Sequence, residues 1–159
     1  MDGEGMELAQ CSVAGVRRVL VVDDHPDTAE VLSVMFACLG YETMSASRGR
    51  DALELAREFD PELIVLDIGL PDINGFEVVH ALRADARSAD RFIVAVTGWS
   101  RPQDIARAKQ TGFDEYFVKP IDLGKIRHML RLAASRAHEN ENATRQPVCD
   151  HAPLAQAHA

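Results

Sequence analysis

Residues 63–67 read Leu-Ile-Val-Leu-Asp, an uninterrupted apolar run that ends in a carboxylate. A continuous run of this kind is typical of a strand that is covered on both faces of a sheet. Open α/β sheets build their sites at the carboxyl ends of such strands. We therefore predict that Asp67 lies at the tip of a central strand and belongs to the functional site.

Three other apolar runs also end in polar residues. They are residues 19–22 with Asp23 and Asp24, residues 93–96 with Thr97, and residues 116–118 with Lys119. A shorter and less apolar run, residues 41–46, is expected at an edge of the sheet. Because parallel strands all point the same way, their carboxyl ends meet at one edge, and we expect the polar residues to lie together there.

Segments with helical spacing separate these runs. The expected helices run from residues 25–27 to Gly40, over residues 51–59, 75–84 and 102–111, and from an Asp122 cap to Ala133. Five strand–helix units with short, right-handed connections predict an α/β fold, a doubly wound parallel sheet with helices on both faces. The first helix is expected to turn Val31, Leu32, Met35, Phe36 and Leu39 toward the core, and Cys38 is expected to be a small core residue.

The pattern of strands and helices occupies only part of the chain. We expect a flexible lead-in over residues 1–16, one domain over residues 17–134, and a disordered tail over residues 135–159. The tail is rich in His, Asn, Ala, Gln and Pro and has few large apolar residues, so it has little to bury.

The bulk composition limits the possible functions. The chain has 159 residues, is 47% hydrophobic and carries a net charge of -8, which argues against nucleic acid as a direct partner. No apolar run approaches the roughly 20 residues of a membrane span, and the acidic N-terminus does not resemble a signal peptide. The three cysteines show no metal or disulfide spacing. We expect a cytoplasmic protein without a membrane partner.

The polar residues at the strand tips suit phosphoryl chemistry. Carboxylates at positions 23, 24 and 67 repel one another unless a cation lies between them, and Mg²⁺ accepts such oxygen ligands. Asp67 can act as a nucleophile that forms an acyl phosphate. Lys119 would then place a positive charge on the phosphoryl oxygens, and Thr97 would donate a hydroxyl.

These residues, taken in order, resemble the receiver domain of two-component response regulators. The matching stretches are residues 19–24, residues 66–75 (Leu-Asp-Ile-Gly-Leu-Pro-Asp-Ile-Asn-Gly), residues 96–98 and residues 116–120. The resemblance implies a flavodoxin-like (CheY-like) sheet of five parallel strands in the order 2-1-3-4-5. It also implies a phosphohistidine donor, either a histidine kinase or a histidine phosphotransfer protein, and an unknown downstream protein that reads the phosphorylated state.

The resemblance further implies roles for individual residues. Asp67 would be the phosphoacceptor; Asp24, Asp67 and the Gly69 backbone carbonyl would ligate Mg²⁺ directly, with Asp23 acting through a bound water. Lys119 would contact the phosphoryl group and precede a cis bond to Pro120. Thr97 would be the switch hydroxyl and Tyr116 the aromatic side chain that swings inward when Thr97 moves.

Two positions near the acceptor are expected to tune the lifetime of the phosphoryl group. Gly69 offers no side chain to position an attacking water. Trp99 shields the site, forms part of a docking surface, or simply packs on a surface loop. The six histidines show no ligand spacing; His25 is expected to shape the loop beside the acidic pair, and most of the others to lie on the surface.

Alternatives to a phosphorylated switch remain at this point. One is a Mg²⁺-dependent phosphatase with an aspartyl nucleophile, although haloacid dehalogenase-type enzymes carry D-x-D-x-[TV] after the first strand, which residues 23–27 do not match. Another is a degenerate receiver that serves as a binding scaffold. Basic residues gather toward the last two helices, where we expect a partner or homodimer surface. They are Arg101, Arg107, Lys109, Lys125, Arg127 and Arg131.

Overall fold

The computed structural model describes residues 16–98 and 101–145. Its strands form one parallel sheet in the order β2-β1-β3-β4-β5. The strands are β1 Arg18–Val22, β2 Glu42–Ala46, β3 Leu63–Asp67, β4 Phe92–Thr97 and β5 Glu115–Val118. The predicted doubly wound sheet and its 2-1-3-4-5 order are confirmed, with β2 at one edge.

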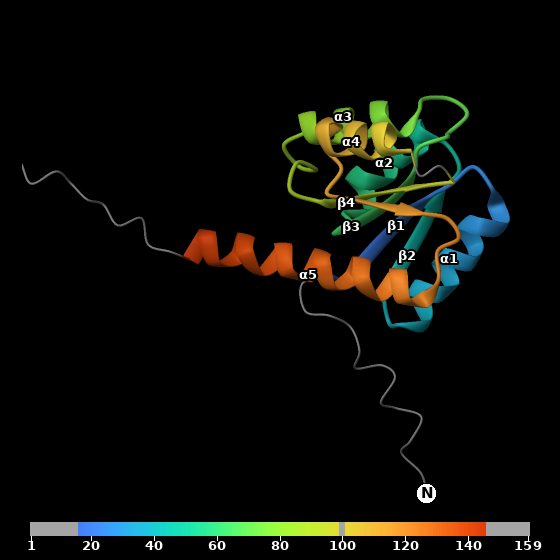
Figure 1. Cartoon of the computed structure of the whole chain (residues 1–159). Helices are drawn as coiled ribbons and strands as arrows, with labels where there is room; N and C mark the ends of the chain where they lie inside the picture. Colours follow the sequence, from blue (N-terminus) through green and yellow to red (C-terminus); the bar gives the residue numbers. More distant parts are fainter. Residues whose placement is uncertain (1–15, 99–100, 146–159) are drawn as a thin grey trace, which may run out of the picture.

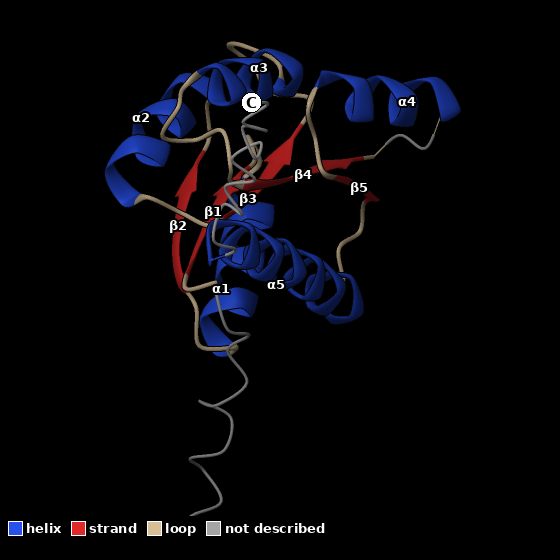
Figure 2. Cartoon of the chain, turned by 90° about the vertical axis from the view of Figure 1, so that its left-hand side faces the viewer, coloured by secondary structure: helices blue, strands red, loops and turns tan. Residues whose placement is uncertain are grey.

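Helices cover both faces of the sheet (Figures 1 and 2). They are α1 Pro26–Cys38, α2 Gly49–Phe59, α3 Gly75–Ala84, α4 Pro102–Thr111 and α5 Leu123–Arg145. Helices α1 and α5 lie on one face, and α2, α3 and α4 lie on the other. None of the helices in the described part of the chain is long and apolar enough to cross a membrane.

Side chains along the central strands point alternately to the two faces of the sheet, and they form a separate hydrophobic core on each face. Leu63 and Val65 of β3 pack in the cluster with α1 and α5, whereas Ile64 and Leu66 pack in the cluster with α2, α3 and α4. Every residue of β3 is buried. A strand with side chains buried on both faces has no polar face to alternate with, which is why it reads as a continuous apolar run.

The prediction for the inward face of α1 was partly wrong. Leu32 and Phe36 are buried as expected, but Val31 is 57% exposed and Cys38 is also exposed. A helix turns by about 100° per residue, so Cys38, two residues after Phe36, faces away from the core. The third buried position on this helix is Ala29, which the prediction did not include.

The start of the predicted disordered tail was also wrong. Helix α5 continues through Arg145, and it projects beyond the sheet in Figure 1. Arg136 binds Asp114 at 2.5 Å, which anchors the first turn of this extension to the loop before β5. The Arg, Ala and Glu residues that follow are good helix formers, and an existing helix propagates without further apolar burial. Residues 1–15 and 146–159 lie outside the described part of the chain.

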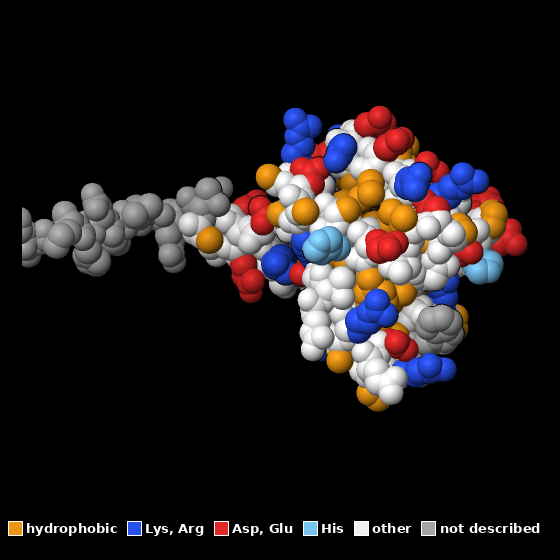
Figure 3. Space-filling model, turned by 90° about the horizontal axis from the view of Figure 1, so that it is seen from above, with side chains coloured by type: hydrophobic (Ala, Val, Ile, Leu, Met, Phe, Trp, Pro, Cys, Tyr) orange, Lys and Arg blue, Asp and Glu red, His pale blue; other side chains and the backbone are white. Residues whose placement is uncertain are grey.

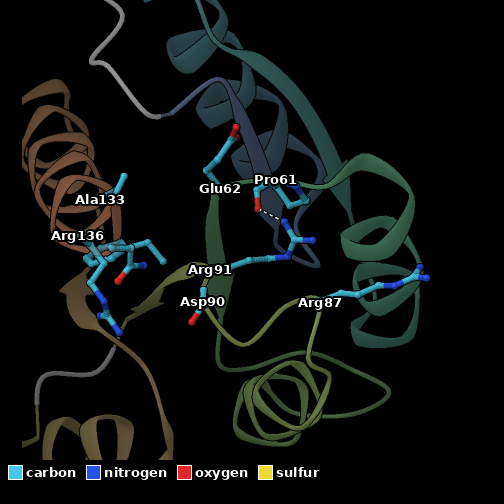
Figure 4. Close-up of a pocket in the computed structure, with 10 residues that line it drawn as sticks. Pro61, Glu62, Arg87, Asp90, Arg91, Ala133 and Arg136 are labelled. Carbon is cyan, nitrogen blue, oxygen red and sulfur yellow. Dashed lines mark hydrogen bonds between the residues drawn. The ribbon is translucent and has the colours of Figure 1, made fainter. Parts of the chain in front are cut away.

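The amino ends of β3 and β4 are held by a buried arginine. Arg91 donates a hydrogen bond to the Pro61 carbonyl (Figure 4) and another to Asp60 at 2.6 Å. A cavity of about 220 Å³ lies beside it, bounded on the other side by α5. This cavity lies at the edge of the sheet opposite to the polar strand tips. The Arg91 guanidinium beside it is already hydrogen bonded to Pro61 and Asp60.

The loop between β3 and α3 is attached to a second element through Asp72. Its carboxylate accepts hydrogen bonds from the backbone N–H groups of Gly49 at 2.8 Å and Arg50 at 3.0 Å, at the start of α2. Burial alone would raise the pKa of Asp72, but these hydrogen bonds outweigh it and lower the pKa to about 2. Helix α2 has no side-chain cap from its own N-cap residue, Arg48, so Asp72 takes that role from a distant loop.

We predict that Asp72→Asn lowers the melting temperature at neutral pH by roughly 2–4 °C, as expected for loss of a charged helix cap. A carboxylate whose native pKa is depressed stabilises the fold above its unfolded pKa, and it loses that effect as the pH falls toward 2. The difference between the two chains should therefore narrow in acid. Thermal denaturation followed by circular dichroism measures it.

Glu58→Gln, which removes an exposed charge from the same helix, is the control and should change little. A difference that stays constant from neutral to acid pH would contradict the capping role of the Asp72 charge.

Candidate functional site

The polar residues that follow the apolar runs meet at the carboxyl edge of the sheet. Strands β1 and β3 are neighbours, with Val22 opposite Leu66, so Asp23 and Asp67 stand side by side in register. Both carboxylates are buried, at 2% and 7% exposure. Two buried like charges in contact are unfavourable unless a cation neutralises them.

Lys119 bridges these two carboxylates. Its Nζ donates to Asp23 Oδ2 at 2.8 Å and to Asp67 Oδ2 at 3.2 Å. It comes from the end of β5, and its bond to Pro120 is cis, as predicted. Burial lowers the pKa of Lys119, but the hydrogen bond to Asp23 and the two carboxylate charges outweigh it and raise the pKa overall. The ammonium group therefore stays charged at neutral pH.

The surroundings of Asp67 have the opposite effect, because they disfavour the charged form of its carboxyl group. Burial raises the pKa of its carboxyl group, the charge of Asp23 raises it further, and the hydrogen bond from the Gly69 backbone N–H partly offsets the rise. That bond joins Gly69 N to Asp67 Oδ1 at 3.1 Å. Perturbed carboxylates at a strand tip are candidates for function.

The residues at this edge also fit a divalent cation. One ligand atom each from Asp23, Asp24, His25 and Asp67 can be chosen so that all lie within 4.8 Å of one another. The buried Oδ1 of Asp24 accepts no hydrogen bond from the described residues. A buried carboxylate oxygen without a donor suits a hard cation such as Mg²⁺, which takes oxygen ligands.

The backbone of the acceptor loop depends on a glycine that our prediction assigned no role. A Cβ at Gly75 would lie 2.7 Å from the Ile68 Cα and 2.9 Å from the Asp67 carbonyl oxygen. Helix α3 therefore begins directly against the backbone of Asp67, and only glycine permits this approach. Asn74 and Glu77 form a capping box at the same point, a pattern of Asn followed three residues later by Glu that the sequence does contain.

Gly69 leaves the approach to Asp67 open. Among the described residues, a Cβ built there would have only the Asp67 carboxylate within 4 Å, at 3.9 Å. A side chain at position 69 would therefore stand beside the acceptor. The second residue expected to affect this access, Trp99, lies outside the described residues.

Thr97 and Tyr116 lie on neighbouring strands, and their side chains are hydrogen bonded. Thr97 is buried and Tyr116 is half-buried against the core shared with α3 and α4. Burial raises the pKa of the Tyr116 hydroxyl, although the hydrogen bond to Thr97 opposes the rise. The two residues that the sequence predicts to act as the switch pair are therefore in direct contact.

Comparisons with known proteins agree with this geometry. The profile of the response regulator receiver domain family matches residues 19–131. The chain is 35% identical over 118 residues to the DNA-binding dual master transcriptional regulator RpaA of Synechocystis, covering 72% of this chain and 49% of that protein. It is 35% identical over 110 residues to the polar-differentiation response regulator DivK of Brucella ovis, covering 69% of this chain and 89% of that protein.

Solved structures show the same fold. The chemotaxis protein CheY4 of Vibrio cholerae superposes with a TM-score of 0.71 at 28% identity, covering 74% of this chain and 98% of that one. The chain spans only about half the length of RpaA and of the DNA-binding response regulator MtrA of Mycolicibacterium smegmatis.

We predict that Asp67→Asn raises the melting temperature at neutral pH by roughly 2 °C or more when divalent cations are absent. Because the native pKa of Asp67 is raised, its ionised form favours unfolding at neutral pH and its protonated form does not. The gain should shrink as the pH falls through the native pKa, where the acid becomes neutral. Thermal denaturation from about pH 4 to about pH 8 measures it.

Glu54→Gln, at an exposed position of α2, controls for the loss of one negative charge. If the Asp67→Asn chain melts at or below the temperature of the unsubstituted chain at neutral pH, the ionised Asp67 carboxylate does not destabilise the fold, and the prediction is wrong.

Proposed function

Because the chain belongs to the response regulator receiver domain family, we propose that it is a signalling switch phosphorylated on Asp67 in a two-component system or phosphorelay. The observation that carries this proposal is the convergence of Asp23, Asp24 and Lys119 on Asp67 at one edge of the sheet. We place the protein in the cytoplasm, where a phosphohistidine donor would be available.

Phosphoryl transfer needs a nucleophile, charge compensation and a positioned donor. An Asp67 carboxylate oxygen forms the new bond to phosphorus, the phosphorus–nitrogen bond of the donor phosphohistidine breaks, and the released imidazole takes up a proton. Lys119, which already holds Asp67 at 3.2 Å, pairs with the incoming phosphoryl oxygens. No small-molecule substrate is turned over, so the chain is a phosphoacceptor that assists its own modification.

The residues that would hold Mg²⁺ are Asp24, Asp67 and the Gly69 carbonyl directly, and Asp23 through a water. A bound Mg²⁺ neutralises the charge that builds up on the transferring phosphoryl group. The chain's own contribution is to keep three carboxylates close together before any phosphoryl group arrives.

The output begins at Thr97. A phosphoryl group on Asp67 attracts the Thr97 hydroxyl, which removes the partner that Tyr116 has in the present structure. Tyr116 then turns inward and changes the surface formed by α4, β5 and α5. A downstream protein, or a second copy of this chain, recognises the altered surface.

The basic residues on that surface are not all available for such contacts. The Arg107 guanidinium lies over the Phe76 ring at 4.1 Å, and the Lys125 Nζ donates to the carbonyl oxygens of Val118 and Pro120. Seen over α2, α3 and α4, acidic and basic side chains are intermixed (Figure 3). With a net charge of -8, this favours protein partners over direct contact with nucleic acid.

The donor is expected to dock on α1. The exposed valines Val31 and Val34, at 57% and 53% exposure, each line a cleft with a residue of the site. Val31 and Lys119 line a cleft of about 540 Å³, and Val34 and Asp23 line another of about 430 Å³. Apolar side chains beside the acceptor suit a helix of a histidine kinase or histidine phosphotransfer protein that carries the phosphohistidine.

We predict that Asp67→Asn abolishes stoichiometric labelling by a phosphohistidine donor with Mg²⁺, because the acceptor oxygen is lost. Thr97→Ala should be labelled normally and fail to change its partner binding, because its hydroxyl acts after transfer. Radiolabel transfer and a pull-down of the downstream partner measure the two effects. Labelling that persists in Asp67→Asn, or catalytic hydrolysis of a small phosphate ester, would contradict the proposal and favour a different acceptor or a phosphatase.

We predict that the double substitution Val31→Asn and Val34→Asn lowers kcat/KM for transfer from the phosphohistidine donor by about tenfold or more. Labelling by a small acyl phosphate, which needs no docking surface, should be unchanged. Ala143→Asn, at an exposed position on the extension of α5, is the control. An equal loss with both phosphoryl donors would show that the valines support the site and do not dock the partner.

A further inference from the structure

His25, the residue after the acidic pair, lies directly beside the carboxylates of the cation site. Its Nδ1 is 3.1 Å from Asp24 Oδ1 and 3.4 Å from Asp23 Oδ1. Its backbone N–H donates to Asp23 Oδ1 at 2.9 Å, which fixes the start of α1 against the site. The imidazole is 71% exposed, so no packing in the core accounts for its position.

The contact between His25 and Asp24 does not have the geometry of a hydrogen bond. Although the two atoms are 3.1 Å apart, the buried Asp24 Oδ1 accepts no hydrogen bond from the described residues. A shared cation brings a nitrogen and an oxygen this close without a hydrogen bond between them. Two ligands of one metal ion are arranged in this way.

The separations also match a shared ion. Adjacent ligands of an octahedral ion with bonds of about 2.1 Å lie about 3.0 Å apart, and opposite ligands about 4.2 Å apart. The distances of 3.1 and 3.4 Å from His25 Nδ1 fall near the adjacent value. The whole group, with Asp67, falls within 4.8 Å, so small side-chain adjustments suffice.

From this geometry we infer that His25 Nδ1 is a ligand of the cation site and gives it a preference for divalent transition metals over Mg²⁺. The inference rests on the cation site of the proposed function. Imidazole nitrogen suits Zn²⁺ and its neighbours, whereas Mg²⁺ prefers oxygen. A site of carboxylates plus one imidazole therefore binds Zn²⁺ or Co²⁺ through His25 and binds Mg²⁺ through the carboxylates.

The test is metal titration of the untagged 159-residue chain with Zn²⁺, Co²⁺ and Mg²⁺. It compares the unsubstituted protein with His25→Ala and His25→Gln. Both substitutions should lower Zn²⁺ and Co²⁺ affinity by about tenfold or more and change Mg²⁺ affinity by less than about twofold. The visible absorption of bound Co²⁺ should also change, since it reports loss of a nitrogen ligand. His80→Ala, an exposed histidine on α3, should alter none of these, and Asp24→Asn should weaken binding of all three metals.

Unchanged Zn²⁺ affinity and Co²⁺ absorption in both His25 variants would overturn the inference. So would an equal loss of Mg²⁺ affinity, because His25 would then act only by shaping the loop. Failure of the proposed switch gives a different result: Asp67 would not be phosphorylated, while the dependence of Zn²⁺ binding on His25 would remain.

Discussion

The close approach of two buried carboxylates, Asp23 and Asp67, is the constraint on which the rest of this structure depends. Neighbouring parallel strands deliver them side by side, and burial increases their repulsion. Lys119 relieves that repulsion from a third strand tip. The proposed phosphoryl transfer would use this arrangement, because the buried carboxylates can share a cation beside the acceptor.

The surrounding elements attach the loop after Asp67 to the fold at two points. Gly75 lets α3 start against the backbone of Asp67, and Asp72 fastens the loop to the start of α2. On the other side, Thr97 and Tyr116 form a hydrogen-bonded pair between two neighbouring strands. The proposed switch joins this acceptor loop to the Thr97–Tyr116 pair, whose hydrogen bond breaks when Thr97 moves toward the phosphoryl group.

Much of this could be predicted from the sequence because strand tips are marked by apolar runs that end in polar residues. Asp67, Asp23 and Lys119 were placed together on that ground, and the structure brings them together. Features that depend on angle or on contact between distant segments were harder to predict. The outward turn of Val31 and Cys38 follows from helix phase, and the continuation of α5 follows from helix propensity and the Arg136–Asp114 pair. The placement of His25 beside the acidic pair was expected, but a role for it as a metal ligand was not, because it follows no ligand spacing along a helix.

The central claim is that Asp67 carries the phosphoryl group as an acyl phosphate. Borohydride reduces an aspartyl phosphate to homoserine, so peptide mass spectrometry of the phosphorylated and reduced protein identifies the acceptor directly. The account predicts homoserine at position 67 after treatment with a phosphodonor and Mg²⁺, and none when Mg²⁺ is removed. Homoserine at another aspartate, or a reduced protein without homoserine despite incorporated phosphate, would contradict it.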